Sequence, residues 1–253
     1  TTNKIQLSVI VLLYHGERWI DSCIGSLEKQ SLERDRYEII LVDNGGSTPS
    51  IHNYNEGRGL KIISFPVNLG FAAGNNQGLA AATGEVLILL NNDTYVTPGW
   101  MTGLVRHLRR RPELGMVGPV TNNIGNEARI DISYRNMGEM LDAAFAYTRA
   151  HARELLYNDT VAFFCAAMTR QAYAAVGPLE EAFGQGFFED DDYCNRLRGK
   201  GYKVAIAEDV FVHHHLSASF GQLEDPQRRA LFERNKAIYE QKWGPWIPHK
   251  YRD

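Results

Sequence analysis

The sequence is poor in cysteine, has no excess of positive charge and contains no long apolar run. Only Cys23, Cys165 and Cys194 are cysteines, and no two of them form a CxxC pair. This odd, scattered set argues against a disulfide framework or a zinc ribbon and favours a reducing compartment, so we expect the cytoplasm. Lysine and arginine number 27 against 30 acidic residues, which leaves no basic field for a nucleic-acid backbone. No stretch approaches the ~20 apolar residues of a membrane span, and residues 1–16 do not read as a signal peptide.

Two nucleotide-binding signatures are also missing. Neither GxGxxG nor GxxxxGK[ST] occurs in the chain, which disfavours a Rossmann dinucleotide site and a P-loop. With 44% hydrophobic and 23% charged residues, the 253-residue chain has the composition of a soluble globular protein. No repeat, low-complexity tract or Gly/Ser linker divides it, so we expect one α/β domain.

Strands and helices alternate through the first 111 residues in what we interpret as four strand-then-helix units. Strands are expected at 7–13, 38–42, 61–65 and 86–90, and helices at 17–30, 71–82 and from Thr97-Pro98, a suitable N-cap and first helical position. This order predicts a parallel sheet whose ligands bind beyond the carboxyl ends of the strands. Further on, we expect strands at 117–120 and 160–168, helices at 138–150 and after Arg170, and a helix from Pro226 to Trp243.

Three of the expected strands run into polar loops. Asp43, Asn68 and Asp93 each follow a strand end, so their loops should meet at one crevice. Asp93 closes the tripeptide Asn91-Asn92-Asp93, and a carboxylate there is poised to hold a divalent cation, since Mg²⁺ commonly takes one or two protein carboxylates plus substrate phosphates. A plain Asx turn is the alternative.

A glycine-rich turn leads into the helix at 71–82. Gly70, Gly74 and Gly78 let a ligand or a neighbouring helix approach the backbone closely. The exposed amides of the helix start, near Asn75, suit phosphate or sugar hydroxyls. Tight packing of the helix on the sheet is the alternative explanation for these small residues.

Four adjacent acids, Glu189-Asp190-Asp191-Asp192, open another predicted helix. Capping of the helix N-terminus explains some of them but not easily four. Helical spacing points neighbouring side chains in different directions, so we expect one carboxylate in the cleft and one directed back into the fold. A carboxylate near a phosphate-bound metal is suited to deprotonate an acceptor hydroxyl.

Three consecutive histidines end an apolar strand. Because alternate residues share a face of a strand, His213 and His215 should point one way and His214 the other. One or two of them are candidate metal ligands, and because histidine with aspartate also suits zinc, spacing alone does not choose the metal.

Taken together and in order, these segments resemble the family 2 glycosyltransferases of the GT-A fold, especially the bacterial members that build surface polysaccharides, rhamnosyltransferases among them. The similar stretches span residues 7 to 219 and are LSVIVLLYHG, EIILVDNGGST, NLGFAAGNNQG, VLILLNNDTYVTPGW, VGPVTNNIGNE, FFEDDDYCNRLRGKGY and VHHHLSAS. The resemblance implies a Rossmann-like, mostly parallel sheet flanked by helices, with a nucleotide-binding half over about 1–120 and an acceptor half over about 121–225, followed by a helix and tail at 226–253.

The resemblance also implies roles for individual residues. Tyr14 and Asp43 would hold the nucleotide, and Asn68 with the glycine-rich turn would lie beside the donor. Asn91-Asn92-Asp93 matches the DxD motif with asparagine in place of the first acid, which makes Asp93 the expected metal ligand. Glu189-Asp190 matches the ED pair, with Asp190 as the base. His214 best matches the metal-coordinating histidine before the Ser219-like position, with His213 and His215 as alternatives.

The expected reaction is an inverting transfer from a UDP- or dTDP-sugar to a hydroxyl of a glycan or lipid-linked acceptor, with Mn²⁺ or Mg²⁺ as cofactor. The metal would neutralise charge on the leaving diphosphate, and Asp190 would take the proton of the attacking hydroxyl in one displacement. An inactive nucleotide- or sugar-binding module and a metal-dependent hydrolase are the alternatives. A nucleotidyltransferase is disfavoured, because Tyr14-His15-Gly16-Glu17 is not a basic, glycine-rich triphosphate loop.

The aromatic and basic C-terminal end, WGPWIPHKYRD, has two interpretations. Packing of this segment back onto the domain is favoured, and peripheral contact with the inner face of the membrane is the alternative. The polar ends of the sequence lead us to expect further domains in the full-length protein.

Overall fold

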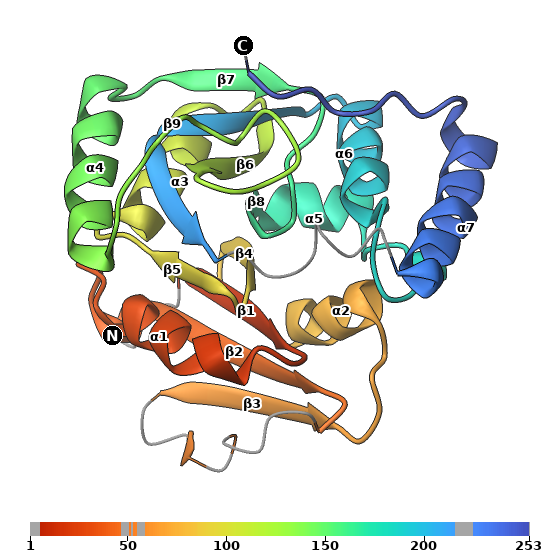
Figure 1. Ribbon diagram of the computed structural model, residues 1–253, viewed down its shortest axis with the longest axis horizontal. Coiled ribbons are helices and arrows are strands. Elements are labelled where there is room, and N and C mark those ends of the chain that lie inside the picture. Colours follow the sequence, from red (N-terminus) through yellow and green to blue (C-terminus); the bar gives the residue numbers. More distant parts are fainter. Residues whose placement is uncertain (1–5, 47–50, 52, 55–58, 216–224, 253) are drawn as a thin grey trace.

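The computed structural model describes residues 6–46, 51, 53–54, 59–215 and 225–252. Its centre is one mixed sheet with the strand order β3-β2-β1-β4-β8-β6-β9-β5, and β7 pairs with β9 beside this path (Figure 1). The strands are β1 (Leu7–Leu13), β2 (Tyr37–Asn44), β3 (Leu60–Phe65), β4 (Val86–Asn91), β5 (Thr94–Val96), β6 (Leu114–Thr121), β7 (Leu155–Asn158), β8 (Cys165–Thr169) and β9 (Lys203–His214).

The first four strands of the order form the parallel part of the sheet. β1 pairs in parallel with β2 and β4, and β2 pairs in parallel with β3. β8 runs antiparallel between β4 and β6, while β6 and β9 are again parallel. Every residue of β1 is buried, as expected for a central strand covered on both faces. The carboxyl ends of β1, β2 and β4 therefore meet at one edge, where the predicted nucleotide-binding loops begin.

Helices cover both faces of the sheet (Figure 1). One core joins α1 (Glu17–Glu28) and α3 (Trp100–Arg110) to the face that carries Val9 and Val11. A second core joins α2 (Phe71–Ala81), α5 (Arg170–Val176) and α6 (Glu189–Gly199) to the opposite face, with Ile10 and Leu12. The alternation of strand side chains thus produces a three-layered α/β domain.

The remaining helices lie toward the ends of the sheet. α4 (Met137–Ala150) packs through Met140 on a smaller core with Phe211 of β9. α7 (Pro226–Trp243) lies beside α6, where Tyr239 Oη accepts a hydrogen bond from Asn195 Nδ2 at 2.8 Å. Short 3₁₀ helices occupy Arg34–Arg36 and Glu181–Phe183.

Several expected boundaries are wrong. α3 begins at Trp100 after Gly99, whose φ of 79° only glycine adopts freely, and Thr97 instead donates from Oγ1 to the carbonyl of Phe211 at 2.6 Å. The strand expected at 160–168 begins only at Cys165. β5 and β7 are short strands that the sequence analysis did not predict. β2 leads to β3 with no α-helix among the described residues between them, so the four expected strand-then-helix units are three.

Across the part of the chain described, no helix combines the length and apolar character needed to cross a membrane.

Candidate active site

A strained loop delivers the acidic pair to the start of α6. Phe187 and Phe188 both have a φ near 70°, a left-handed conformation that costs bulky residues on the order of 1–3 kcal/mol each. The loop is held by Asn235 of α7, a completely buried residue whose Nδ2 donates to the carbonyls of Phe183 at 2.7 Å and Gly186 at 2.6 Å. The sequence analysis missed Asn235, because an asparagine within a polar helix carries no motif.

The carboxylates of Asp191 and Asp192 make contacts that hold other parts of the fold. Asp192 is fully buried, and its carboxylate accepts hydrogen bonds from Arg196 Nε at 3.0 Å, Lys242 Nζ at 2.6 Å and Trp243 Nε1 at 2.9 Å. Asp191 accepts from Trp246 Nε1 at 3.0 Å and lies 2.8 Å from His249 Nε2. These contacts fasten α7 and the tail to α6.

Glu189 and Asp190, together with Asp191, line a pocket of about 390 Å³. Its wall also includes residues of the 124–126 loop, the strained loop, α7 and the tail, among them Ile124, Asn126, Thr160, Phe187, Phe188, Arg228, Phe232, Trp246, Pro248 and His249. Trp246 packs on Phe188 and Phe232 with ring centroids 5.1 and 5.7 Å apart, so the tail folds back onto the domain as favoured from the sequence.

Glu189 and Asp190 both have raised pKa values. Burial, followed by the repulsive charge of Asp191, raises the pKa of Asp190 to about 7. Burial and the neighbouring Asp190 also raise the pKa of Glu189, whose Oε2 has no hydrogen-bond partner in the described structure. A carboxyl with a pKa near neutrality is well matched to general acid–base work at neutral pH.

At the edge of the sheet, the short strand β5 brings Asp93 and His214 together. Thr94 pairs with His214 in the β5–β9 ladder, and the His215 amide donates to the Asp93 carbonyl at 2.9 Å. His214 Nε2 then lies 3.3 Å from Asp93 Oδ1, while the ring stacks on Phe164 at 5.2 Å.

The other two histidines point to the opposite side, as strand alternation predicts. His213 Nε2 is 3.2 Å from His215 Nδ1. His213 also contacts Tyr134 Oη at 2.6 Å, and His215 stacks on Trp19 at 3.8 Å.

The chemistry of the Asp93–His214 pair fits a divalent cation. Nδ1 of His214 is 2.7 Å from the carbonyl of Asn123, which can only accept, so Nδ1 carries a proton and Nε2 faces the Asp93 carboxylate. Two acceptors this close require a proton or a cation between them. Burial lowers the pKa of His214, but the Asp93 carboxylate outweighs it, so the net pKa is raised. Within the described residues no three His, Cys, Asp or Glu side chains converge on a metal site, so phosphate or water oxygens would complete the coordination of Mn²⁺ or Mg²⁺.

The predicted nucleotide-side residues lie at the ends of β1, β2 and β4. Tyr14 follows β1, is 42% exposed, and its ring is tilted against that of His15. Asp43 is the second-last residue of β2 and is buried. Asn91 ends β4, and Asn92 Nδ2 donates to the carbonyl of His15 at 2.7 Å, which ties the loops after β1 and β4 together. Tyr14 is thus the most accessible of these side chains.

A second asparagine, not identified from the sequence, organises the loop before α2. Asn44 donates from Nδ2 to Asn68 Oδ1 at 2.9 Å and accepts from the amide of Leu69 at 2.8 Å. Asn68 Oδ1 also accepts from the amide of Gly70 at 2.9 Å. The sequence does offer one indication of this role, since Asn44 directly follows Asp43 at a strand end.

The glycine-rich turn is packed against protein. Gly70 has a φ of 95°, and a Cβ on it would lie 2.5 Å from the carbonyl oxygen of Gly184. A Cβ on Gly74 would lie 2.5 Å from Leu12 Cδ1. The first amide of α2, that of Phe71, donates to the Gly184 carbonyl at 2.9 Å, so the expectation that this amide is open to a ligand is wrong.

The side chain of Asn75 is also directed into the fold. Asn75 is 2% exposed, and its Nδ2 donates to the carbonyl of Phe71 at 3.0 Å.

The contact between Gly70 and Gly184 brings the predicted donor-side turn against the segment that leads to Glu189. The two halves of the expected site are therefore adjacent.

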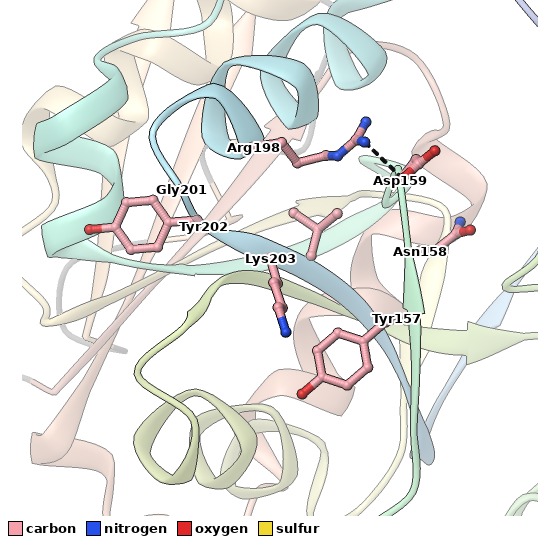
Figure 2. A pocket seen from close by; sticks show the side chains of 8 residues that line it. Tyr157, Asn158, Asp159, Arg198, Gly201, Tyr202 and Lys203 are labelled. Carbon is pink, nitrogen blue, oxygen red and sulfur yellow. Dashed lines mark ion pairs between the residues drawn. The ribbon is translucent and has the colours of Figure 1, made fainter.

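A larger hollow of about 580 Å³ lies apart from these groups, between α6, β7 and the start of β9. Figure 2 shows Arg198 paired with Asp159 on one side and Lys203 near Tyr157 on the other. None of the residues proposed from the sequence lines it.

Comparison with known proteins agrees with this fold. The family model described as "Glycosyl transferase family 2" matches residues 8–177. The fold is that of the GT-A class of glycosyltransferases. The family match covers more than half of the sequence, and the chain belongs to glycosyltransferase family 2. The matched region contains Asp93 but ends before Glu189.

Among the curated relatives that match most of the chain are two much longer proteins. It is 29% identical over 222 residues to the uncharacterized protein y4gI of Sinorhizobium fredii, with 82% of this chain and 24% of that protein covered. It is 25% identical over 261 residues to the O-antigen biosynthesis protein RfbC of Myxococcus xanthus, covering 97% of this chain and 20% of the relative. The chain thus spans about a quarter or less of the length of these two relatives.

Solved structures show the same fold at low identity. GalNAc-T7, crystallised with UDP, GalNAc and Mn²⁺, superposes with a TM-score of 0.65 at 16% identity, covering 85% of this chain and 44% of that one. The mannosyltransferase PcManGT of Pyrobaculum calidifontis, in complex with GDP-Man and Mn²⁺, gives 0.63 at 19% identity, covering 85% and 58%.

Proposed function

We propose that this chain is an inverting, metal-dependent glycosyltransferase, EC class 2.4, that moves a sugar from a nucleotide-diphosphate donor to an acceptor hydroxyl in cell-surface polysaccharide synthesis. The observation that carries the proposal is Asp190, a carboxyl with a pKa raised to about 7 in the wall of a pocket of about 390 Å³. Family membership and the printed role of RfbC in O-antigen biosynthesis support it.

Asp190 acts as the general base. Its carboxylate takes the proton of the acceptor hydroxyl as the hydroxyl oxygen bonds to the anomeric carbon and the bond to the leaving phosphate breaks. Attack from the side opposite the leaving group inverts the anomeric configuration, and no covalent sugar–enzyme intermediate forms. Glu189 lies buried beside Asp190, and burial followed by the charge of Asp190 raises the pKa of the Glu189 carboxyl.

Asp93 and His214 would hold the Mn²⁺ or Mg²⁺ ion. When bound, such an ion neutralises negative charge on the leaving nucleotide diphosphate. Tyr14 and Asp43 would hold the nucleotide, with Asn68, Asn91 and Asn92 around the donor. Gly70, Gly74 and Asn75 would support this loop from within the fold. The pairs UDP with Mn²⁺ and GDP-Man with Mn²⁺ in the two structural neighbours support a donor of this class, and a UDP- or dTDP-sugar is our candidate.

The acceptor would be a glycan or lipid-linked glycan that enters the pocket beside Asp190. Residues 1–120 would then serve the donor and 121–225 the acceptor, with α7 and the tail closing the acceptor side. The three cysteines are free and buried, which is compatible with a reducing compartment, so we infer action in the cytoplasm, at the inner face of the membrane where a lipid-linked acceptor is used. Further domains of a longer protein would extend this unit.

The test is release of free nucleotide from UDP-, dTDP- and GDP-sugars with Mn²⁺, with Mg²⁺ and with chelator. We expect one of UDP, dTDP and GDP to be released in a metal-dependent way, and Asp190→Asn to lose at least about 100-fold in rate while still binding that nucleotide. Asp142→Asn, the same change at an exposed position of α4, is the matched control. Full activity of Asp190→Asn contradicts the assignment of the base, and nucleotide binding with no release by the wild type indicates a binding module. Nucleotide release that yields only free sugar, unchanged by any glycan acceptor, indicates a hydrolase.

A further inference from the structure

The C-terminal tail is tied to the acid-bearing helix by two groups on the same carboxylate. Trp246 Nε1 donates to Asp191 Oδ2 at 3.0 Å, and His249 Nε2 lies 2.8 Å from Asp191 Oδ1. Farther along, Arg252 pairs with Glu208 Oε1 of β9 at 2.6 Å. The tail therefore passes across the end of α6 (Figure 1) and is anchored both to α6 and to β9.

This crossing puts a cationic side chain into the wall of the base's pocket. His249 lines the same pocket as Glu189 and Asp190, although it lies far from them in the sequence. Asp191, whose carboxylate pairs with His249, directly follows Asp190 in the sequence. The backbone amide of Asp191 also donates to Asp190 Oδ1 at 2.9 Å. His249 is therefore linked to Asp190 through Asp191, by an ion pair on one side and a backbone hydrogen bond on the other.

The charges that face Asp190 are of both signs. Desolvation and the charge of Asp191 raise the pKa of Asp190, and His249 opposes this rise. Burial lowers the pKa of His249, but the hydrogen bond and charge of Asp191, with further contributions from Asp190 and Glu127, raise it to about 9. The imidazole is therefore protonated at neutral pH.

The other nearby charged groups do not replace His249. Glu189 is a carboxyl and supplies no positive charge to the pocket, and Lys242 is paired with Asp192 at 2.6 Å. Arg228 lines the same pocket but stacks over the ring of Phe187, with its guanidinium carbon 5.4 Å from the ring centroid. Among the described side chains, His249 is the cation that pairs with the carboxylate adjacent to the base.

We propose that His249 is a positioning residue for the transfer reaction: its imidazolium, held by Asp191 in the wall of the pocket, increases the ionised fraction of the Asp190 carboxyl at neutral pH and so the fraction ready to take the acceptor's proton. The inference rests on the function proposed above for Asp190. Its physical basis is that a cation near two adjacent carboxyls offsets their mutual repulsion and so favours the charged form of the base. His249 itself exchanges no proton with the substrate.

The test is the pH dependence of kcat/KM for the wild type, His249→Gln and His249→Lys, with the donor on which the wild type is active. We expect the acid limb of His249→Gln to move up by about one pH unit, which is about a tenfold loss near pH 6.5 and near-normal activity near pH 8.5. His249→Lys retains the charge and should keep the wild-type profile. His151→Gln, which breaks a similar exposed pair with Glu154 on the distant end of α4, is the matched control and should leave the profile unchanged.

A second measurement does not depend on turnover. In protein labelled with ¹³C at the aspartate carboxyls, the Asp190 signal, assigned with Asp190→Asn, should titrate at higher pH in His249→Gln than in the wild type. Coincident titration curves and coincident rate profiles overturn the proposal, as does a loss in both His249 variants that is equal at all pH values, because that pattern reflects packing alone. A wild type that transfers no sugar contradicts the proposed function, and the carboxyl titration still decides whether His249 sets the ionisation of Asp190.

Discussion

His214 and Asp93 face each other at the edge of the sheet, with Nε2 of the imidazole 3.3 Å from Oδ1 of the carboxylate. The pairing of β5 with β9 produces this contact, since it sets Thr94 opposite His214. The second ring nitrogen is fixed by the carbonyl of Asn123 at 2.7 Å, so the ring cannot turn without losing that hydrogen bond. The two side chains that we propose as metal ligands are thereby held in one orientation before any substrate arrives.

Removal of either partner should abolish metal-dependent nucleotide binding. In thermal-shift measurements with UDP, dTDP and GDP, we expect Mn²⁺ to enhance the stabilisation of the wild type by its nucleotide, because a ligand that binds only the folded state raises its stability. Asp93→Ala and His214→Gln should lose the metal-dependent part. His213→Gln, on the other side of the strand, is the matched control and should retain it. An undiminished Mn²⁺ response in Asp93→Ala would contradict the assignment of Asp93.

Neutral substitutions of the acidic residues of α6 should affect the free energy of unfolding differently, depending on whether the residue serves the reaction or the fold. Asp192→Asn leaves Arg196 and Lys242 without their buried partner, and we expect it to lower the free energy of unfolding by about 3–5 kcal/mol. Asp190→Asn removes a carboxyl that is disfavoured in its charged form, so stability at neutral pH should be unchanged or higher. Urea denaturation at pH 7 measures both. A marked destabilisation of Asp190→Asn would indicate that Asp190, too, serves the fold.

Much of this arrangement follows from local sequence, and the rest depends on contacts between distant segments. LSVIVLL predicts β1 because an apolar, β-branched run suits a strand covered on both faces, and the structure has β1 at the same residues. By contrast, β5 is three residues long and gains its partner only when β9 lies beside it. The roles of Asn235 and His249 arise from α7 and the tail folding back onto α6, and no local pattern encodes that. The direction of the three histidines was predictable, since strand alternation fixes it, but the closeness of His214 to Asp93 was not.

Close packing, which was the alternative explanation for the small residues of α2, leads to a stability prediction. A Cβ on Gly78 would lie 2.4 Å from Ile10 Cγ2 in the centre of the sheet, so Gly78→Ala should cost about 1–3 kcal/mol by overpacking. Gly25 in α1 has no atom within 4 Å of such a Cβ, and Gly25→Ala should stabilise the protein by about 0.5–1 kcal/mol through helix propensity. Equal effects of the two substitutions in urea denaturation would mean that helix propensity, and not contact with β1, decides the residue at 78.

The His249–Asp191 pair should make the protein less stable as the pH rises. The pKa of His249 is about 9 in the folded protein against an ordinary value of 6.5, so the folded state binds this proton more tightly than the unfolded state does. The resulting stabilisation is fully present below about pH 6.5, falls through pH 9 and amounts to at most about 3 kcal/mol. The raised pKa of Asp190, about 7, acts in the same direction but its effect is complete near neutrality. Urea denaturation of the wild type at pH 6.5 and 9 should therefore show a decline that His249→Gln largely lacks and that His151→Gln retains. Parallel declines in the wild type and His249→Gln would show that the tail is not held by a charged imidazole.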